Sequence, residues 1–183
     1  MVYFPHKKYS VVYADPPWSY QDKCRRGGGA ENHYSCMSID DICRLPVRSI
    51  CEDDSVLFMW TTFPQLELAF SVVSSWGFVY KTCAFTWVKT NKDDSLFMGM
   101  GRYTRANAEI CLIGKRGNGL KRLSGSVRNT HLCKRLRHSE KPVLFRELIV
   151  ELFGDVSRIE LFARTKAEGW DVWGNEVGKF SSN

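Results

Sequence analysis

The fold is most constrained by the way in which short apolar runs alternate with amphipathic segments. Residues 9–14 and 55–60 are apolar and rich in β-branched or aromatic side chains, which predicts two buried strands. Residues 64–76 include a proline suited to a first turn and repeat apolar side chains at helical spacing, which predicts a helix. Alternating strands and helices are typical of an α/β fold with a mostly parallel central sheet flanked by helices. Further strands are predicted at 78–88, 109–113, 158–163 and 170–173, and further helices at 38–45 and 142–153.

The predicted helices also show where they begin and which side packs inward. Ser38 is the expected N-cap of the first helix, and Gly77 the expected stop of the second. Trp60, Trp76 and Trp87 are expected in the core. The expected apolar faces are Leu66, Ala69, Phe70 and Val73 on the second helix, and Val143, Leu144, Leu148 and Leu152 on the third.

Length and composition fit one domain over residues 1–183. The chain has 183 residues, 44% hydrophobic and 25% charged, which excludes disorder throughout. It has no apolar run near the roughly 20 residues that cross a bilayer, and no signal peptide is recognisable. Its seven cysteines include no Cys-x-x-Cys pair, so we expect reduced thiols and no metal site, His131, Cys133 and His138 being the sole weak candidate group. These features predict a cytoplasmic protein without a membrane partner.

Positive charge is concentrated in one segment. The net charge is +6, and residues 115–137 hold eight Lys and Arg with no Asp or Glu, so the other 160 residues carry −2. Gly and Ser interrupt the segment, which predicts a basic loop inserted before the C-terminal third. Lys and Arg release counterions when they bind phosphates, so a nucleic acid is the expected partner. A merely solvated loop is the alternative.

Asp15-Pro16-Pro17-Trp18 stands at the end of the first predicted strand, where ligands of open α/β sheets bind. The prolines lack N–H donors, so their carbonyls and the Asp15 carboxylate are expected to be free acceptors, with Trp18 as a flat apolar face. This arrangement suits a planar ligand with an exocyclic amino group, such as adenine. Asp15, Pro16, Pro17 and Trp18 are therefore the catalytic candidates.

Motifs over almost the whole chain resemble those of one family, the Asp-Pro-Pro-Trp N6-adenine methyltransferases related to the catalytic subunit of eukaryotic mRNA adenosine methyltransferase. Small bacterial and phage DNA-modifying enzymes are also members. The resemblance implies a circularly permuted Rossmann-like methyltransferase fold, which accounts for the absence of Gly-x-Gly-x-x-Gly after an early strand. Besides residues 13–18, the motifs are His33–Met37, Leu45–Val47, Leu57–Thr62, Trp76–Phe78, Trp87–Lys89, Tyr103–Arg105, Glu109, His138–Pro142, Ile159–Arg164 and Gly169–Glu176.

The resemblance implies S-adenosylmethionine as cofactor, in a site shared between Asp15 and the C-terminal third. Lys141 would meet the carboxylate of the cofactor, and Phe162 would lie beside its adenine. Arg164, Asn175 and Glu176 would hold its ribose, for which a carboxylate is a suitable bidentate acceptor. Asp15 and the Pro16 carbonyl would bind both amino hydrogens of the target adenine, so that its nitrogen faces the methyl group in line.

The target base must leave its stack to reach such a site, and Trp18 and Tyr34 are the stacking candidates. We expect contacts mainly with phosphates. Methylation of adenine in DNA is the leading expectation, in a microbe or a virus-infected host cell. The same reaction on RNA, N4 methylation of cytosine, and a catalytically silent nucleic-acid-binding subunit stay open, as does a homodimer or a partner subunit. The substrate candidates are Arg25, Arg26, Tyr34, Tyr103, Arg105, Lys121, Arg122, Lys134 and Arg135, with Arg102 beside them.

Overall fold

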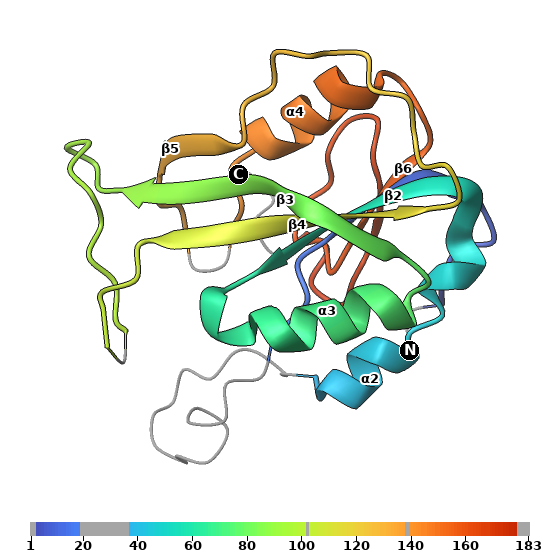
Figure 1. The fold of residues 1–183 in the computed structure, drawn as a ribbon, viewed down its shortest axis with the longest axis horizontal. Helices are drawn as coiled ribbons and strands as arrows, with labels where there is room; N and C mark the ends of the chain where they lie inside the picture. The colour runs from blue at the N-terminus through green and yellow to red at the C-terminus, as the bar shows by residue number, and fades with distance from the viewer. Residues whose placement is uncertain (1–2, 19–36, 102, 138–139, 179–183) are drawn as a thin grey trace.

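The computed structural model describes residues 3–18, 37–101, 103–137 and 140–178. Its centre is a sheet of seven strands: β1 (Tyr9–Ala14), β2 (Cys51–Thr61), β3 (Val79–Thr90), β4 (Ala108–Arg116), β5 (Thr130–Lys134), β6 (Arg158–Leu161) and β7 (Asp171–Trp173). The strand order is β5-β3-β4-β2-β1-β6-β7 (Figure 1). Every neighbouring pair is parallel except the two that contain β4. The predicted α/β fold with a mostly parallel sheet is confirmed, and its circular permutation stays a prediction.

Helices cover both faces of this sheet. They are α2 (Ile39–Arg44), α3 (Leu66–Ser75) and α4 (Leu144–Phe153), with the 3-10 turns η1 (Val47–Ile50) and η2 (Phe63–Gln65). Side chains alternate along β1, so Val12 and Ala14 pack in the core with α2 and α3, whereas Val11 and Tyr13 pack with α4 on the other face. Within the described part of the chain, no helix is both long and apolar enough to cross a membrane.

The residues predicted to begin one helix and to end another, Ser38 and Gly77, are confirmed in these positions. The hydroxyl of Ser38 accepts a hydrogen bond from the Asp41 N–H (3.1 Å) and so caps α2. Gly77 follows α3 with a φ of 84°, a backbone conformation that favours glycine. The three tryptophans expected in the core, at 60, 76 and 87, are buried.

The predicted inward faces are only partly right. In α3, Phe70 is 38% exposed and packs against Tyr80, while Val72 is buried beside Ala69. The buried stripe of α3 runs through Ala69, Val72 and Val73 to Trp76, so Phe70 lies at its edge. The expected Val143 is exposed because it is the N-cap residue before α4, whose buried face consists of Phe145, Leu148, Ile149 and Phe153 along the length of the helix.

The predicted basic loop over residues 115–137 is a loop only in its middle, because its first residues complete β4 and its later part forms β5. Since β4 alone runs against the other strands, Arg116 lies at the opposite end of the sheet from the carboxyl ends of β1 and β5. The chain then passes beside α4 to reach β5 (Figure 1), and the Leu123 N–H donates to the Leu152 carbonyl there (2.8 Å). The basic segment is therefore divided between the two ends of the sheet.

Candidate active site

Asp15 follows β1 near the middle of the sheet, where β2 and β6 flank that strand. The carbonyl of Pro16 accepts a hydrogen bond from the Trp18 N–H (2.8 Å), and the carbonyl of Pro17 accepts one from the Met37 N–H (3.3 Å). The expectation that both proline carbonyls are free is thus wrong, because the turn uses them to fix its own shape. A carbonyl oxygen has two lone pairs, so Pro16 retains capacity for one more donor.

Trp18 is a core residue and not an open platform. It is 9% exposed, and its indole N–H donates to the Trp60 carbonyl at the end of β2 (3.0 Å). A buried indole needs such a partner for its N–H group. The expectation that Trp18 presents a flat face for stacking is therefore corrected: this side chain anchors the Asp15 turn to β2.

Four charged side chains form an ion cluster beside this turn: Asp15, Lys141, Glu109 and Lys89. The Lys141 ammonium lies 2.6 Å from Asp15 Oδ2 and 3.2 Å from Glu109 Oε2. Glu109 Oε1 in turn pairs with Lys89. The Lys141 side chain is only 7% exposed, so its charge depends on these two carboxylates. The ammonium groups also lie near aromatic rings, Lys141 near that of Trp60 (5.5 Å) and Lys89 near that of Trp87 (4.8 Å).

The ion cluster stabilises the charges of Glu109 and Lys141. Burial by itself raises the pKa of Glu109, but Lys141 and Lys89 outweigh burial and hold this pKa at about 2. Burial by itself lowers the pKa of Lys141, but Asp15 and Glu109 raise it to about 12. Both groups therefore carry full charge at neutral pH, and the cluster of two carboxylates and two ammonium groups is neutral as a whole.

A cavity of about 370 Å³, here called the Asp15 cavity, opens next to the ion cluster. Four predicted cofactor residues line it together: Asp15, Lys141, Phe162 and Arg164. They come from the end of β1, the approach to α4 and the segment after β6. Charges of both signs surround the space, namely Asp15, Glu140, Glu160 and Glu168 with Lys141, Arg146, Arg164 and Lys166.

The wall formed after β6 has an unusual backbone. Phe162 has a φ of 61°, which costs about 1–3 kcal/mol for a residue with a side chain and needs support from its surroundings. Its ring meets Trp173 edge-on at 5.6 Å between centroids, and the Ala163 N–H donates to the Trp173 carbonyl (3.0 Å). A Cβ atom at Gly174 would lie 2.9 Å from the Ala163 nitrogen, so only glycine allows these segments to pack this closely.

The two remaining predicted cofactor residues, Asn175 and Glu176, are placed differently. Glu176 Oε2 lies 3.2 Å from the Arg164 Nε, so it adjoins the residue with which it was expected to hold a ribose. Asn175 is exposed and does not line the Asp15 cavity.

A buried ion pair supports the floor of the Asp15 cavity. The Arg146 Nε and Nη2 groups of α4 donate to the two carboxylate oxygens of Glu160 in β6, at 2.6 and 3.0 Å. Burial raises the pKa of Glu160, against the effect of Arg146. Arg146 also donates to the Thr165 hydroxyl (3.3 Å). This bidentate pair fixes α4 relative to β6 and thereby the distance between the two sides of the cavity.

The predicted substrate residues fall into three groups. Arg105, Lys134 and Arg135 are exposed and Tyr103 is 97% exposed. Lys134 ends β5 and Arg135 follows it, at the Asp15 end of the sheet, and Tyr103 and Arg105 belong to the segment that joins β3 to β4 at that end. Lys121 and Arg122 follow β4 toward the opposite end of the sheet, away from Asp15, and their contact with a substrate stays a prediction. Outside the described residues lie Arg25, Arg26, Tyr34 and Arg102.

The family model MT-A70 matches residues 9–176, which include the described ion cluster and the Asp15 cavity. The chain belongs to the MT-A70 family. The predicted family, its methyltransferase fold and the prediction of an enzyme are thereby confirmed.

Relatives of this MT-A70 chain include a type II methyltransferase and N(6)-adenosine methyltransferases. Type II methyltransferase M.MunI of Mycoplasma sp is 37% identical over 191 residues, which cover 94% of this chain and 79% of that protein. An N(6)-adenosine-methyltransferase MT-A70-like protein of Drosophila melanogaster is 29% identical, covering 93% and 27% respectively. The human N(6)-adenosine-methyltransferase catalytic subunit METTL3 is 28% identical, covering 93% and 28%. The chain thus spans most of M.MunI and less than a third of the two animal proteins.

Sequence reasoning gave two members of the ion cluster no role in this MT-A70 chain, namely Lys89 and Glu109. Each stands at the end of an apolar run, Lys89 after Trp87-Val88 and Glu109 before Ile110-Cys111-Leu112. A charged residue in such a run needs a partner when the strand is buried. Opposite charges at the facing ends of two consecutive predicted strands were therefore a usable signal.

Proposed function

We propose that this chain transfers the methyl group of S-adenosylmethionine to the N6 amino group of adenine in DNA. The observation that carries the proposal is the position of Asp15, held by Lys141 at the mouth of the Asp15 cavity. Membership of the MT-A70 family and the 37% identity to a type II methyltransferase support it.

The residues of the Asp15 cavity fit this cofactor. S-adenosylmethionine combines a carboxylate, an ammonium group, a sulfonium, a ribose and a flat base, and the cavity offers charges of both signs and an aromatic ring. Lys141 and Phe162 would hold its carboxylate and its base, and Arg164 with Glu176 its ribose. When bound, the cofactor supplies an electrophilic methyl group on its sulfonium sulfur.

The residues of the Asp15 turn orient the nucleophile. Lys141 occupies Oδ2 of Asp15, which leaves Oδ1 for one amino hydrogen of the base. The remaining lone pair of the Pro16 carbonyl accepts the other. Two such acceptors favour a pyramidal nitrogen whose lone pair faces the methyl group. Catalysis then rests on positioning and electrostatics without a covalent enzyme intermediate.

DNA is preferred to RNA because the type II methyltransferase M.MunI matches this chain over most of both lengths, whereas the N(6)-adenosine methyltransferases are less identical and far longer. The exposed cations Arg105, Lys134 and Arg135 near the Asp15 end of the sheet suit contacts with phosphates. The intact pair of Asp15 and Lys141 argues against a silent subunit, which has no use for a charged acceptor beside a cavity.

The test is methyl transfer from labelled S-adenosylmethionine to matched DNA and RNA oligonucleotides, single- and double-stranded, with the modified base identified by mass spectrometry. N6-methyladenine in DNA alone supports the proposal. Activity on RNA alone, or N4-methylcytosine, would replace it with the corresponding alternative. A protein that neither binds S-adenosylmethionine, measured by thermal shift, nor transfers its methyl group would favour the silent subunit.

The variant Asp15→Asn tests whether the Asp15 carboxylate takes part in methyl transfer. The amide keeps the shape of the side chain but loses the charge that pairs with Lys141 and one acceptor position, so we expect kcat to fall at least a hundredfold. Asp171→Asn, which changes an exposed carboxylate paired with Lys7, is the matched control and should retain normal turnover. Turnover in Asp15→Asn within threefold of that of the unaltered protein would contradict the assigned mechanism.

A further inference from the structure

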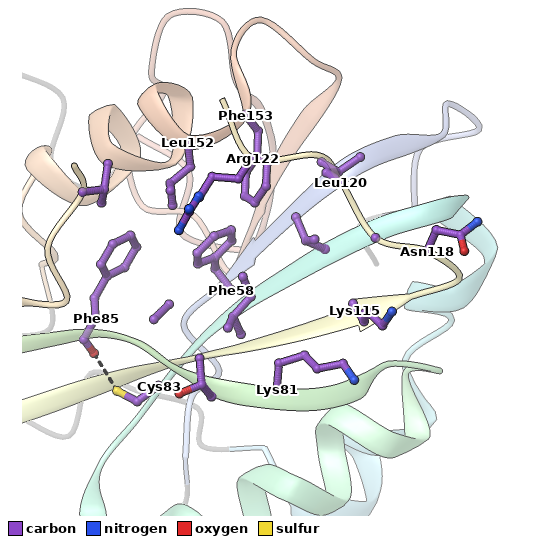
Figure 2. Close-up of a pocket in the computed structure, with 16 residues that line it drawn as sticks. Phe58, Lys81, Cys83, Phe85, Lys115, Asn118, Leu120, Arg122, Leu152 and Phe153 are labelled. Atoms are coloured by element: carbon purple, nitrogen blue, oxygen red, sulfur yellow. Dashed lines mark hydrogen bonds between the residues drawn. The ribbon is translucent and has the colours of Figure 1, made fainter. Parts of the chain in front are cut away.

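A second cavity lies on the α4 face of the sheet, toward the end opposite Asp15. It has a volume of about 390 Å³, within the range of small-molecule sites. Strands β2, β3 and β4 form its floor, and the end of α4 and the segment after β4 form its sides (Figure 2). We call it the Phe58 cavity. It has no lining residue in common with the Asp15 cavity.

Packed aromatic rings lie at the base of the Phe58 cavity. The rings of Phe58 and Phe85 are stacked at 5.6 Å between centroids, and the ring of Phe153 meets Phe58 edge-on at 6.1 Å. Figure 2 shows Phe85 and Phe58 on the floor with Phe153 above them. Phe58 and Phe85 are 0% and 1% exposed, so their rings form a buried base, and the apolar surface open to a ligand is that of the half-buried Ile113, Val127 and Leu152.

Three cations complete the Phe58 cavity, and none of its lining residues is acidic. Lys81 and Lys115 stand on the neighbouring strands β3 and β4, and Arg122 points inward from the segment after β4 (Figure 2). Among the described residues none of the three forms a salt bridge. Asp54, the carboxylate that interacts with Lys115, is bound through both oxygens by Asn118 (2.7 and 3.2 Å). Asp54 therefore offsets part of the charge of Lys115, and no carboxylate of the described residues pairs with Lys81 or Arg122.

The side of the Phe58 cavity that carries Arg122 is fixed in place. The Leu123 N–H donates to the Leu152 carbonyl, and the hydroxyls of Ser124 and Ser126 both donate to Glu151 Oε1 (2.8 and 3.1 Å). These three hydrogen bonds attach residues 123–126 to the last turns of α4. The cavity is therefore formed before any ligand arrives, which lowers the entropic cost of binding.

We propose that the Phe58 cavity binds an amphipathic anion, with an apolar body against Ile113, Val127 and Leu152 and a phosphate or carboxylate held by Lys81, Lys115 and Arg122. Arg122 supplies a planar donor for two oxygens of such a group, and the two lysines supply point charges. The proposal is independent of the methyl-transfer activity, because it uses residues away from the Asp15 turn.

Calorimetric titration with 1-naphthyl phosphate tests the site, with 1-naphthol as the uncharged analogue. We expect the phosphate to bind at least tenfold more tightly than the alcohol, and octyl phosphate and adenosine monophosphate distinguish acyl from nucleotide ligands. The double variant K115Q/R122Q should weaken binding of the phosphate at least tenfold. Lys92→Gln, which removes an exposed charge elsewhere, should leave binding unchanged, as should Asp15→Asn.

A second measurement locates the binding site without relying on a variant that could be unfolded. Methyl NMR shifts of Val127 and Leu152, which line the cavity, should move on titration, while those of Val143 at the other end of α4 should not. Circular dichroism checks that each variant is folded. Equal binding of phosphate and alcohol, no binding of any probe, or displacement of naphthyl phosphate by a short DNA duplex would each overturn the proposal.

Discussion

Lys141 joins two distant parts of the sequence in the candidate active site. Its ammonium group contacts Asp15, 126 residues earlier, and Glu109 on β4. A lysine that is almost fully buried stays protonated here because two carboxylates stabilise the charge. The position of Asp15 in this structure therefore depends on residues from three separate segments.

Glu109 makes stability depend on pH in the acid range. Its pKa is about 2 in the folded chain against an ordinary value of 4.5. Its contribution to the free energy of unfolding is complete above pH 4.5 and is lost as the pH falls toward 2, because the unfolded chain binds the proton first. The full shift corresponds to about 3 kcal/mol.

We therefore expect Glu109→Gln to be less stable at neutral pH and to lose less stability on acidification. Urea unfolding at a series of pH values measures both effects. Glu147→Gln, at an exposed position of α4, should keep the pH dependence of the unaltered protein. The idea fails if the Glu109→Gln and unaltered proteins show the same slope below pH 4.5.

At the scale of elements, the close approach of the segments after β6 and β7 shapes the Asp15 cavity. A methyl group at Gly174 would lie 2.9 and 3.0 Å from the backbone nitrogen and oxygen of Ala163. We expect Gly174→Ala to cost about 1–3 kcal/mol through the backbone shift it forces. The same shift should move Phe162 and weaken binding of S-adenosylmethionine at least tenfold by calorimetry.

Gly125→Ala is the matched control for this prediction. A Cβ atom at Gly125 would meet only the Arg122 guanidinium, at 3.9 Å. Thermal unfolding and cofactor binding should stay close to those of the unaltered protein. Similar losses in the two alanine variants would show that the close contact at Gly174 does not shape the site.

The sequence predicted elements better than it predicted their arrangement. Strand β1 and the cap at Ser38 are confirmed because apolar runs and capping residues act locally. The reversed direction of β4 could not be predicted, because the direction of a strand depends on distant hydrogen-bond partners. Lys141 was expected at the site through resemblance, but its pairing with Glu109 depends on the same long-range arrangement.

At the scale of the whole molecule, the reversal of β4 places basic residues at both ends of the sheet. Lys134 and Arg135 follow β5 near the Asp15 end, whereas Lys121 and Arg122 lie toward the other. One stretch of sequence with a single sign of charge thus supplies two separate surfaces. Under the proposed function, only the first faces the reacting nucleic-acid strand.

This division predicts different effects for two pairs of neutralised cations. K134Q/R135Q should weaken binding of a short DNA duplex and reduce the slope of log K against log salt by about two, because two phosphate contacts are lost. K121Q/R122Q removes the same charge at the other end and should leave the slope nearly unchanged. Fluorescence anisotropy at several salt concentrations measures both, and equal reductions would contradict the division.

The neutrality of the ion cluster has a consequence for how the medium acts on the protein. Dissolved ions screen exposed charges such as Lys134 strongly, and they act much less on buried charges that are already paired, such as Lys141 and Glu109. Ionic strength should therefore govern how often a nucleic-acid strand is captured and have little influence on the groups that hold the reacting atoms. Capture and turnover become separately adjustable, the first by the salt content of the surroundings and the second by the interior of the protein.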